Sequence, residues 1–144
     1  MTTTSVYVQR EFECTPKELF RWISDPNSLA QWFGPKQLKV GAVEMDVRVG
    51  GTYSIELLRP DNTGFYIKGH YTEIEQDHKL TFTFEYYGID NKPPNSLVKI
   101  YIEEITTSAS RLSLEQKFVT MSTDMENRSA AWRYMMEQLH LLIK

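Results

Sequence analysis

Residues 123–143 read TDMENRSAAWRYMMEQLHLLI, a stretch whose apolar side chains recur at the spacing of an α-helix. It contains no proline, and Thr123 or Asp124 is a suitable N-cap. One stripe of the predicted helix is apolar, and it consists of Met125, Trp132, Met136, Leu139 and Ile143, widened by Met135 and Leu142. A helix with so large an apolar face requires another element to cover it.

The chain before this helix follows a two-residue period, which is typical of strands. Between Leu80 and Tyr86, apolar side chains alternate with Thr81, Thr83 and Glu85, which predicts one buried face and one exposed face. Turn-forming residues separate six such segments. The predicted strands cover residues 38–47, 51–59, 64–75, 79–87, 97–106 and 110–119.

A further strand and two short helices are predicted at the start of the chain. Residues 6–12 alternate in the same way as the later strands. Thr15-Pro16 provides a cap and a first helical residue, and Asp25-Pro26 ends the helix that follows. A second short helix is predicted for residues 27–32, before a Gly-Pro break.

This order of elements predicts an α+β fold. Hairpin-length connections make the strands antiparallel, and a sheet with one apolar face needs one cover. The C-terminal helix is the only predicted element large enough to provide it. We therefore expect a seven-stranded curved antiparallel sheet wrapped around the long helix, with the two short helices between the first and second strands and a space left inside. All 144 residues are expected to form one domain.

Composition and charge narrow the class of protein. The net charge of −3 provides no basic surface for a phosphate backbone, so we expect no nucleic-acid partner. The single cysteine, Cys14, excludes an internal disulfide and is typical of a reducing compartment. No run of about 18 apolar residues is present, so we expect no membrane span. These features predict a cytoplasmic protein.

Several motifs in this order carry a resemblance to a known family. They are the opening segment REFECTPKELF at residues 10–20, WFGP at 32–35, DVRVGG at 46–51 and GHYTEI at 69–74. Together they resemble the helix-grip fold of the START and plant-pathogenesis-allergen superfamily. The resemblance is closest to the branch named after the activator of heat-shock-protein-90 ATPase.

The resemblance implies a cavity between sheet and helix that holds a hydrophobic or amphiphilic small molecule. It leaves two other functions open, because some relatives are cyclases, hydrolases or transferases and others stimulate a chaperone ATPase. Binding without catalysis is the favoured reading, and docking on a chaperone or formation of a homodimer is the third. The sequence contains no phosphate loop or dinucleotide-binding glycine fingerprint, since Gly50-Gly51 lies in a predicted hairpin, so no cofactor is expected.

Seven Phe, eight Tyr and three Trp residues are a heavy aromatic load for this chain length, and the rings either fill a solid core or line a cavity. Met135 and Met136 suit an adaptable wall. If a cavity is present, the predicted ligand-binding residues are Arg10, Trp22, Trp32, Phe33, Tyr53, Phe65, Tyr71, Phe82, Phe84, Trp132 and Met136. The loop at 88–96 is expected to form a rim over one end of the cavity or a plain surface connection.

Arg10 is the most informative polar residue, because it falls on the apolar side of the first strand. A buried guanidinium needs a partner, so Arg10 either reaches a carboxylate such as Glu115 or anchors an anionic ligand head.

Acid–base chemistry in the cavity is conceivable from polar residues on the predicted strands, namely Glu56, His70, Tyr71, Glu73 and Tyr101. No metal site is expected, because Glu137 and His140 have the spacing of half a di-iron motif and no second Glu-x-x-His completes it.

Overall fold

The structure is a computed structural model that describes residues 4–119 and 125–143. The strands and helices follow the predicted order. They are β1 (Thr4–Phe12), α1 (Pro16–Ser24), α2 (Pro26–Leu29), β2 (Lys39–Met45), β3 (Thr52–Leu58), β4 (Gly64–Glu75), β5 (Lys79–Tyr87), β6 (Ser96–Thr106), β7 (Ala109–Phe118) and α3 (Met125–Ile143). The predicted N-caps of α3, Thr123 and Asp124, lie outside the described residues.

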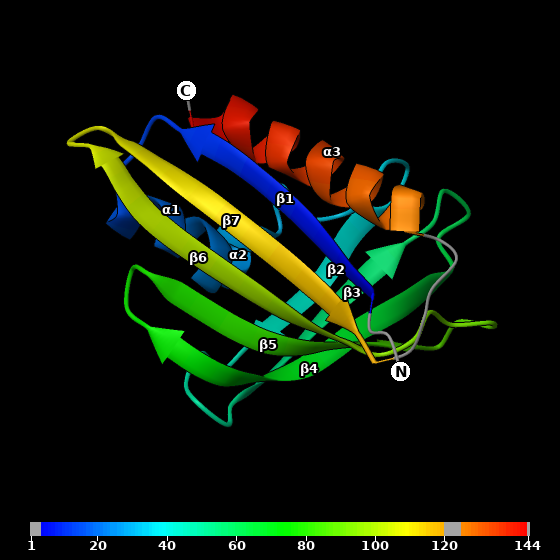
Figure 1. The fold of residues 1–144 in the computed structure, drawn as a ribbon. Coiled ribbons are helices and arrows are strands. Elements are labelled where there is room, and N and C mark those ends of the chain that lie inside the picture. Colours follow the sequence, from blue (N-terminus) through cyan, green and yellow to red (C-terminus); the bar gives the residue numbers. More distant parts are fainter. Residues whose placement is uncertain (1–3, 120–124, 144) are drawn as a thin grey trace.

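The seven strands form one antiparallel sheet in the order β1-β7-β6-β5-β4-β3-β2. Figure 1 shows the sheet curving around α3, which runs beside β1, while α1 and α2 lie behind β6 and β7 in this view. The predicted helix-grip architecture is therefore confirmed. The strands β1 and β2 are the two edges of this sheet.

Local capping explains where the short helices begin and end. The Thr15 hydroxyl accepts a hydrogen bond from the Glu18 amide at 3.2 Å, and the Glu18 carboxylate accepts one from the Thr15 amide at 3.3 Å, which completes a capping box. Asp25 ends α1 and caps α2 through the Ser28 amide at 2.9 Å. The predicted second helix, 27–32, is too long, because the amides of Gln31 and Trp32 bond the carbonyl three residues back in tight turns.

The core lies between the concave face of the sheet and α3. Alternate side chains of β6 and β7, such as Val98 and Leu112, are fully buried there. From α3, the buried side chains are Trp132, Met135, Met136 and Leu139. Leu142 was expected on this stripe, but it is 40% exposed and lies in the last turn of α3.

The seam between β4 and β5 is irregular. The register shifts between Tyr71 and Glu73, and Gly69 lies two residues before this shift, between the Lys68–Glu85 and Tyr71–Phe82 pairs. The hydroxyl of Tyr53 on β3 reaches across Gly69 and donates to the Thr83 carbonyl at 2.5 Å. A Cβ atom at Gly69 would lie 2.0 Å from that carbonyl oxygen, so this position needs glycine.

The exposed face of β5 also differs from the simple alternation. Thr81 was expected to be exposed, yet it is buried, and in the register it lies between Glu73 and Lys99. Long polar side chains on neighbouring strands are able to bury a short one between them.

Candidate functional site

Two hollows lie between the sheet and α3. The inner one has a volume of about 30 Å³ and is almost entirely apolar. A cavity needs about 10–15 Å³ for one water molecule, so this one has no room for a ligand. Most of the predicted lining rings therefore pack against one another. The residues around it are Ile23, Leu29, Trp32, Phe33, Met45, Tyr53, Ile55, Tyr71, Leu80, Phe82, Phe84, Ile100 and Trp132.

The outer hollow is ten times larger, with a volume of about 310 Å³, and it is partly open. This volume falls within the usual range of small-molecule sites. Its walls come from the segment before β2, the strands β3, β4, β5 and β7, the loop after β5, and α3. They are Phe33, Pro35, Leu38, Leu57, Phe65, Ile67, Phe84, Tyr86, Ile89, Asn91, Pro93, Gln116, Arg128, Ala131, Trp132 and Met135.

Three rings separate the two hollows, because Phe33, Phe84 and Trp132 line both. The Trp132 ring centroid lies 6.1 Å from that of Phe33, nearly edge-on, and 6.0 Å from that of Phe84. Aromatic pairs prefer such offset and tilted arrangements. These rings form a packed partition that we call the ring wall, Phe33–Phe84–Trp132.

A buried polar chain fixes one member of the ring wall. The Trp132 indole N–H donates to Gln116 Oε1 at 2.8 Å, and Gln116 Nε2 donates to the Ser96 hydroxyl at 2.9 Å. All three residues are buried, and Gln116 is only 1% exposed. A buried amide needs hydrogen-bond partners, so these two hydrogen bonds hold both the Trp132 indole and the Gln116 amide in fixed orientations.

One cation lies in the outer hollow. Arg128, on α3, donates from Nη1 to the Tyr86 hydroxyl at 3.2 Å, and its guanidinium carbon lies 5.6 Å from the Tyr86 ring centroid. Arg128 is the one formally charged residue among the described residues that line this hollow.

The structure places the predicted site residues in three groups. Seven line the inner hollow, and Phe65 lines the outer one together with the ring wall. Trp22, Met136 and Arg10 line neither. Met136 is buried in the core, and half-buried Trp22 accepts the Trp32 indole N–H through its carbonyl at 2.9 Å. The seven are Trp32, Phe33, Tyr53, Tyr71, Phe82, Phe84 and Trp132.

Sequence reasoning missed two polar residues of the outer hollow, Gln116 and Arg128. Arg128 precedes Trp132 by four residues and Met135 by seven, which is the spacing of one helix face. A cation on the buried stripe of α3 was therefore visible in the sequence. Gln116 carried a similar signal, because it continues the alternation of Leu112 and Leu114 on β7.

Arg10 reaches a carboxylate, as one of the two alternatives expected, but the partner is Glu137 of α3 and not Glu115. The distance between Arg10 Nη1 and Glu137 Oε1 is 2.9 Å. Glu115 lies on the other face of the sheet, where it accepts the Tyr7 hydroxyl at 2.8 Å. Arg10 shares its face with Leu112, its partner in the register, so period-2 geometry directs Arg10 and Glu115 to opposite sides.

We expect Arg10→Ala to lower the free energy of unfolding by about 0.5 kcal/mol, because both partners in the Arg10–Glu137 pair are a third to a half exposed. Glu137→Gln should cause a similar loss, and neither change should alter ligand affinity. Urea denaturation measures the stability of both variants, and fluorescence titration with the anionic probe 8-anilino-1-naphthalenesulfonate measures their ligand affinity. If Arg10→Ala, but not Glu137→Gln, bound this probe more weakly, Arg10 would be an anchor for an anionic ligand head after all.

The acid–base pair expected on the strands is not assembled in either hollow. Glu56, His70, Glu73 and Tyr101 lie on the convex face of the sheet, where Glu73 is paired with Lys79 at 3.1 Å. Among the described lining residues there is no carboxylate, imidazole, amine or thiol.

Two tyrosines of the inner hollow, Tyr53 and Tyr71, have raised pKa values. Burial in the apolar interior is the main cause for both, because it disfavours the phenolate. Both hydroxyls therefore stay protonated at neutral pH.

Within residues 4–119 and 125–143, no group of three or more His, Cys, Asp or Glu side chains is placed to hold a metal ion. None of the helices described there combines the length and hydropathy needed to cross a membrane.

Solved structures share this fold over nearly the whole chain. Protein CV1439 from Chromobacterium violaceum has a TM-score of 0.86 and 24% sequence identity, and the match covers 96% of each chain. The AHSA1 protein SPO3351 from Silicibacter pomeroyi has a TM-score of 0.82 and 23% identity, again over 96% of each chain. CalU16 from Micromonospora echinospora has a TM-score of 0.73 and 20% identity, covering 99% of this chain and 77% of CalU16.

The sequence matches a family but no individual curated protein. None of the curated proteins matches the sequence. The model of one family, described as Activator of Hsp90 ATPase homolog 1-like protein, matches residues 13–144. This match spans the capped first helix, all six strands after it and α3, so the chain belongs to the Activator of Hsp90 ATPase homolog 1-like family.

Proposed function

We propose that this protein binds an apolar or amphiphilic small molecule in the outer hollow. The observation that carries the proposal is the hollow itself, which has a volume of about 310 Å³ and walls made mainly of apolar side chains with a few polar groups. Ligand sites commonly combine such walls with a small number of oriented polar groups. The buried hydrogen bonds from Trp132 to Gln116 and from Gln116 to Ser96 hold the Gln116 amide and the Trp132 indole in fixed positions at the wall of the hollow.

The lining favours binding over catalysis. General acid–base catalysis at neutral pH works best with a group whose pKa lies near the working pH. The described residues around both hollows provide tyrosines with raised pKa values and an arginine. A cyclase or hydrolase function, and docking on a chaperone or on a second copy, remain predictions from the family resemblance.

Ala131→Phe tests the proposal, because Ala131 lines the outer hollow and a phenyl group there would occupy it. The neutral fluorescent probe N-phenyl-1-naphthylamine should bind to the unaltered protein and lose at least about tenfold in affinity with Ala131→Phe. A tenfold loss corresponds to about 1.4 kcal/mol. Fluorescence titration measures the affinity.

Ala130→Phe is the matched control, since Ala130 is the preceding residue of the same helix and is exposed. It should leave probe affinity within about twofold of the unaltered protein, on the order of 0.4 kcal/mol. The proposal fails if the probe does not bind, or if both phenylalanine variants weaken binding equally.

A further inference from the structure

We infer that the outer hollow recognises a carbonyl group of its ligand, and that the side-chain amide of Gln116 donates the hydrogen bond that recognises it. The ligand class is an apolar molecule that carries a ketone, ester or amide carbonyl near the ring wall. This inference rests on the proposed function and adds to it the polar group that the ligand presents.

Two partners fix the orientation of the Gln116 amide. An indole N–H only donates, so the amide oxygen has to face Trp132, and Trp132 Nε1 lies 2.8 Å from Gln116 Oε1. The amide nitrogen then faces the Ser96 hydroxyl, which lies 2.9 Å from Gln116 Nε2. An amide nitrogen carries two N–H groups, so one of them is left after the bond to Ser96.

The side chains beside Gln116 provide no acceptor for this second N–H group. In the register, Gln116 of β7 is paired with Val6 of β1 and with Val98 of β6, and both valines are buried. The neighbours on the same face of β7 are Leu114 and Phe118. In the described part of the chain, the two bonds given above are the only side-chain hydrogen bonds of Gln116. The second N–H group therefore depends on the contents of the hollow that Gln116 lines.

The unused N–H group determines the kind of ligand group that fits. Buried N–H groups without an acceptor are rare in proteins, whereas a carbonyl oxygen with a single hydrogen bond is more common. Gln116 is only 1% exposed, so an acceptor brought to its N–H group replaces an unfavourable state. A ligand carbonyl oxygen only accepts hydrogen bonds, and it is the matching group.

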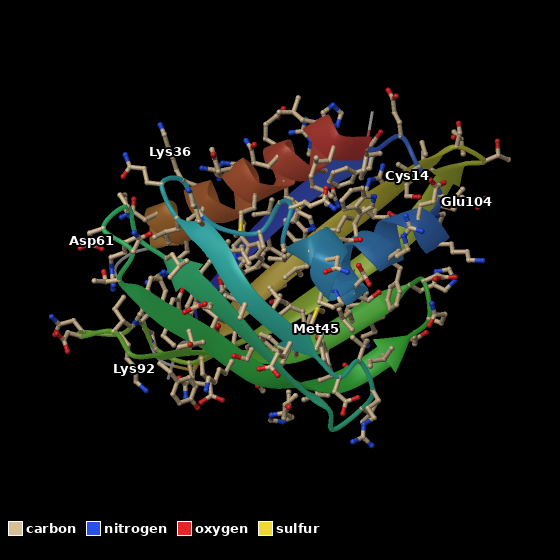
Figure 2. The ribbon with its side chains drawn as sticks, turned by 180° about the vertical axis from the view of Figure 1, so that it is seen from behind. Cys14, Lys36, Met45, Asp61, Lys92 and Glu104 are labelled. Carbon is tan, nitrogen blue, oxygen red and sulfur yellow. The ribbon has the colours of Figure 1, made fainter. Side chains whose placement is uncertain are left out.

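The mouth of the outer hollow lies at one end of the molecule. Lys36 follows the lining residue Pro35, and Lys92 follows the lining residue Asn91. Figure 2 shows both lysines at the same end of the molecule. Asn91 is exposed there, so water competes with a ligand for its hydrogen bonds.

Two further polar side chains, Tyr86 and Arg128, line the hollow and bind each other. Arg128 Nη1 donates to the Tyr86 hydroxyl at 3.2 Å, and both residues are partly exposed. Among the described residues that line the outer hollow, Gln116 is the one buried polar side chain. Recognition of the carbonyl is therefore assigned to Gln116.

Two neutral fluorescent probes with the same rings test this assignment. They are 6-propionyl-2-(dimethylamino)naphthalene and its analogue 6-propyl-2-(dimethylamino)naphthalene, in which a methylene group replaces the carbonyl. Gln116→Met keeps the length of the side chain and removes the amide. It should lower the ratio of the carbonyl probe's affinity to the analogue's affinity by about tenfold. A change in the shape of the wall affects both probes, so it cancels in this ratio.

Gln9→Met is the matched control. Gln9 is exposed on β1, its Nε2 donates to the Ser113 hydroxyl at 2.9 Å, and it does not line the outer hollow. The substitution removes the same kind of hydrogen bond, and the affinity ratio should stay within about twofold of that of the unaltered protein. Circular dichroism shows whether each variant is folded.

NMR spectroscopy of the unaltered protein provides a readout that does not depend on a folded Gln116→Met variant. Proton–nitrogen spectra report the two Nε2 protons of Gln116 separately. Because a hydrogen bond deshields the donated proton, the carbonyl probe should move one of these signals downfield relative to the analogue. Ring-current shifts are shared by the two probes, since their rings are the same.

The outcomes distinguish this inference from the proposed function. If both probes bind but Gln116→Met leaves the affinity ratio unchanged, or if both probes give the same Gln116 proton signals, carbonyl recognition by Gln116 is refuted and the binding function stands. If neither probe binds, the proposed function fails and the inference fails with it. A ratio lowered by Gln116→Met and not by Gln9→Met, together with the downfield signal, supports both.

Discussion

Trp132→Phe is expected to lower the free energy of unfolding by about 3 kcal/mol. The substitution removes the indole N–H that Gln116 accepts at 2.8 Å, and a buried acceptor that loses its donor costs about 1–3 kcal/mol. It also removes ring volume from a residue that is only 3% exposed, which leaves a cavity beside Phe33 and Phe84. Urea denaturation followed by circular dichroism measures the loss.

Trp22→Phe is the matched control, because it makes the same chemical change at a half-buried tryptophan outside both hollows. We expect it to cost less than about 1 kcal/mol. Gln116→Leu should lower stability in the unaltered protein and cost less in the Trp132→Phe background, since the two share one hydrogen bond. Equal losses for the two tryptophans would contradict the role assigned to the polar chain.

Gly69→Ala is expected to cost about 3 kcal/mol, because the new methyl group has no space at the β4–β5 seam. Its Cβ would lie 2.0 Å from the Thr83 carbonyl oxygen and 2.7 Å from the Thr83 hydroxyl. The backbone has to move, and this also strains the Tyr53 bond to the same carbonyl. The free energy of unfolding again provides the readout.

Gly41→Ala controls for loss of a strand glycine without that clash. The nearest atoms to a Cβ at Gly41 belong to the Glu56 side chain, whose carboxylate end is free to rotate away. A cost below about 1 kcal/mol is expected, because Glu56 would give up its bond to the Ala42 amide at the surface. If Gly41→Ala were as damaging as Gly69→Ala, the seam would not be the cause.

The fold was predictable because local signals agreed with one another. Strands 64–75 and 79–87 begin and end at the predicted residues, since turn-forming residues lie on both sides of each. Thr15-Pro16 and Asp25-Pro26 specified α1 through capping. The second helix was overextended because its tight turns beyond Leu29 have no separate sequence signature.

The site was only partly predictable, because a list of rings does not state how much space they leave. Trp32, Tyr53, Tyr71 and Phe82 lie together as predicted, yet their packing leaves about 30 Å³. The larger space depends on distances between α3 and loops, which no local pattern encodes. Arg10 was predicted to need a partner because it falls on the apolar side of β1. The sequence does not show that α3 places the Glu137 carboxylate beside it.

The ring wall belongs at once to the hydrophobic core and to the proposed ligand site, and this limits how the protein can evolve. A substitution at Phe33, Phe84 or Trp132 that reshapes the site also lowers the free energy of unfolding, which is small in most proteins. Residues of the loop after β5, such as Asn91 and Pro93, line the same hollow outside the buried core. New ligand preferences are therefore expected to arise first in that loop, with the ring wall inherited unchanged.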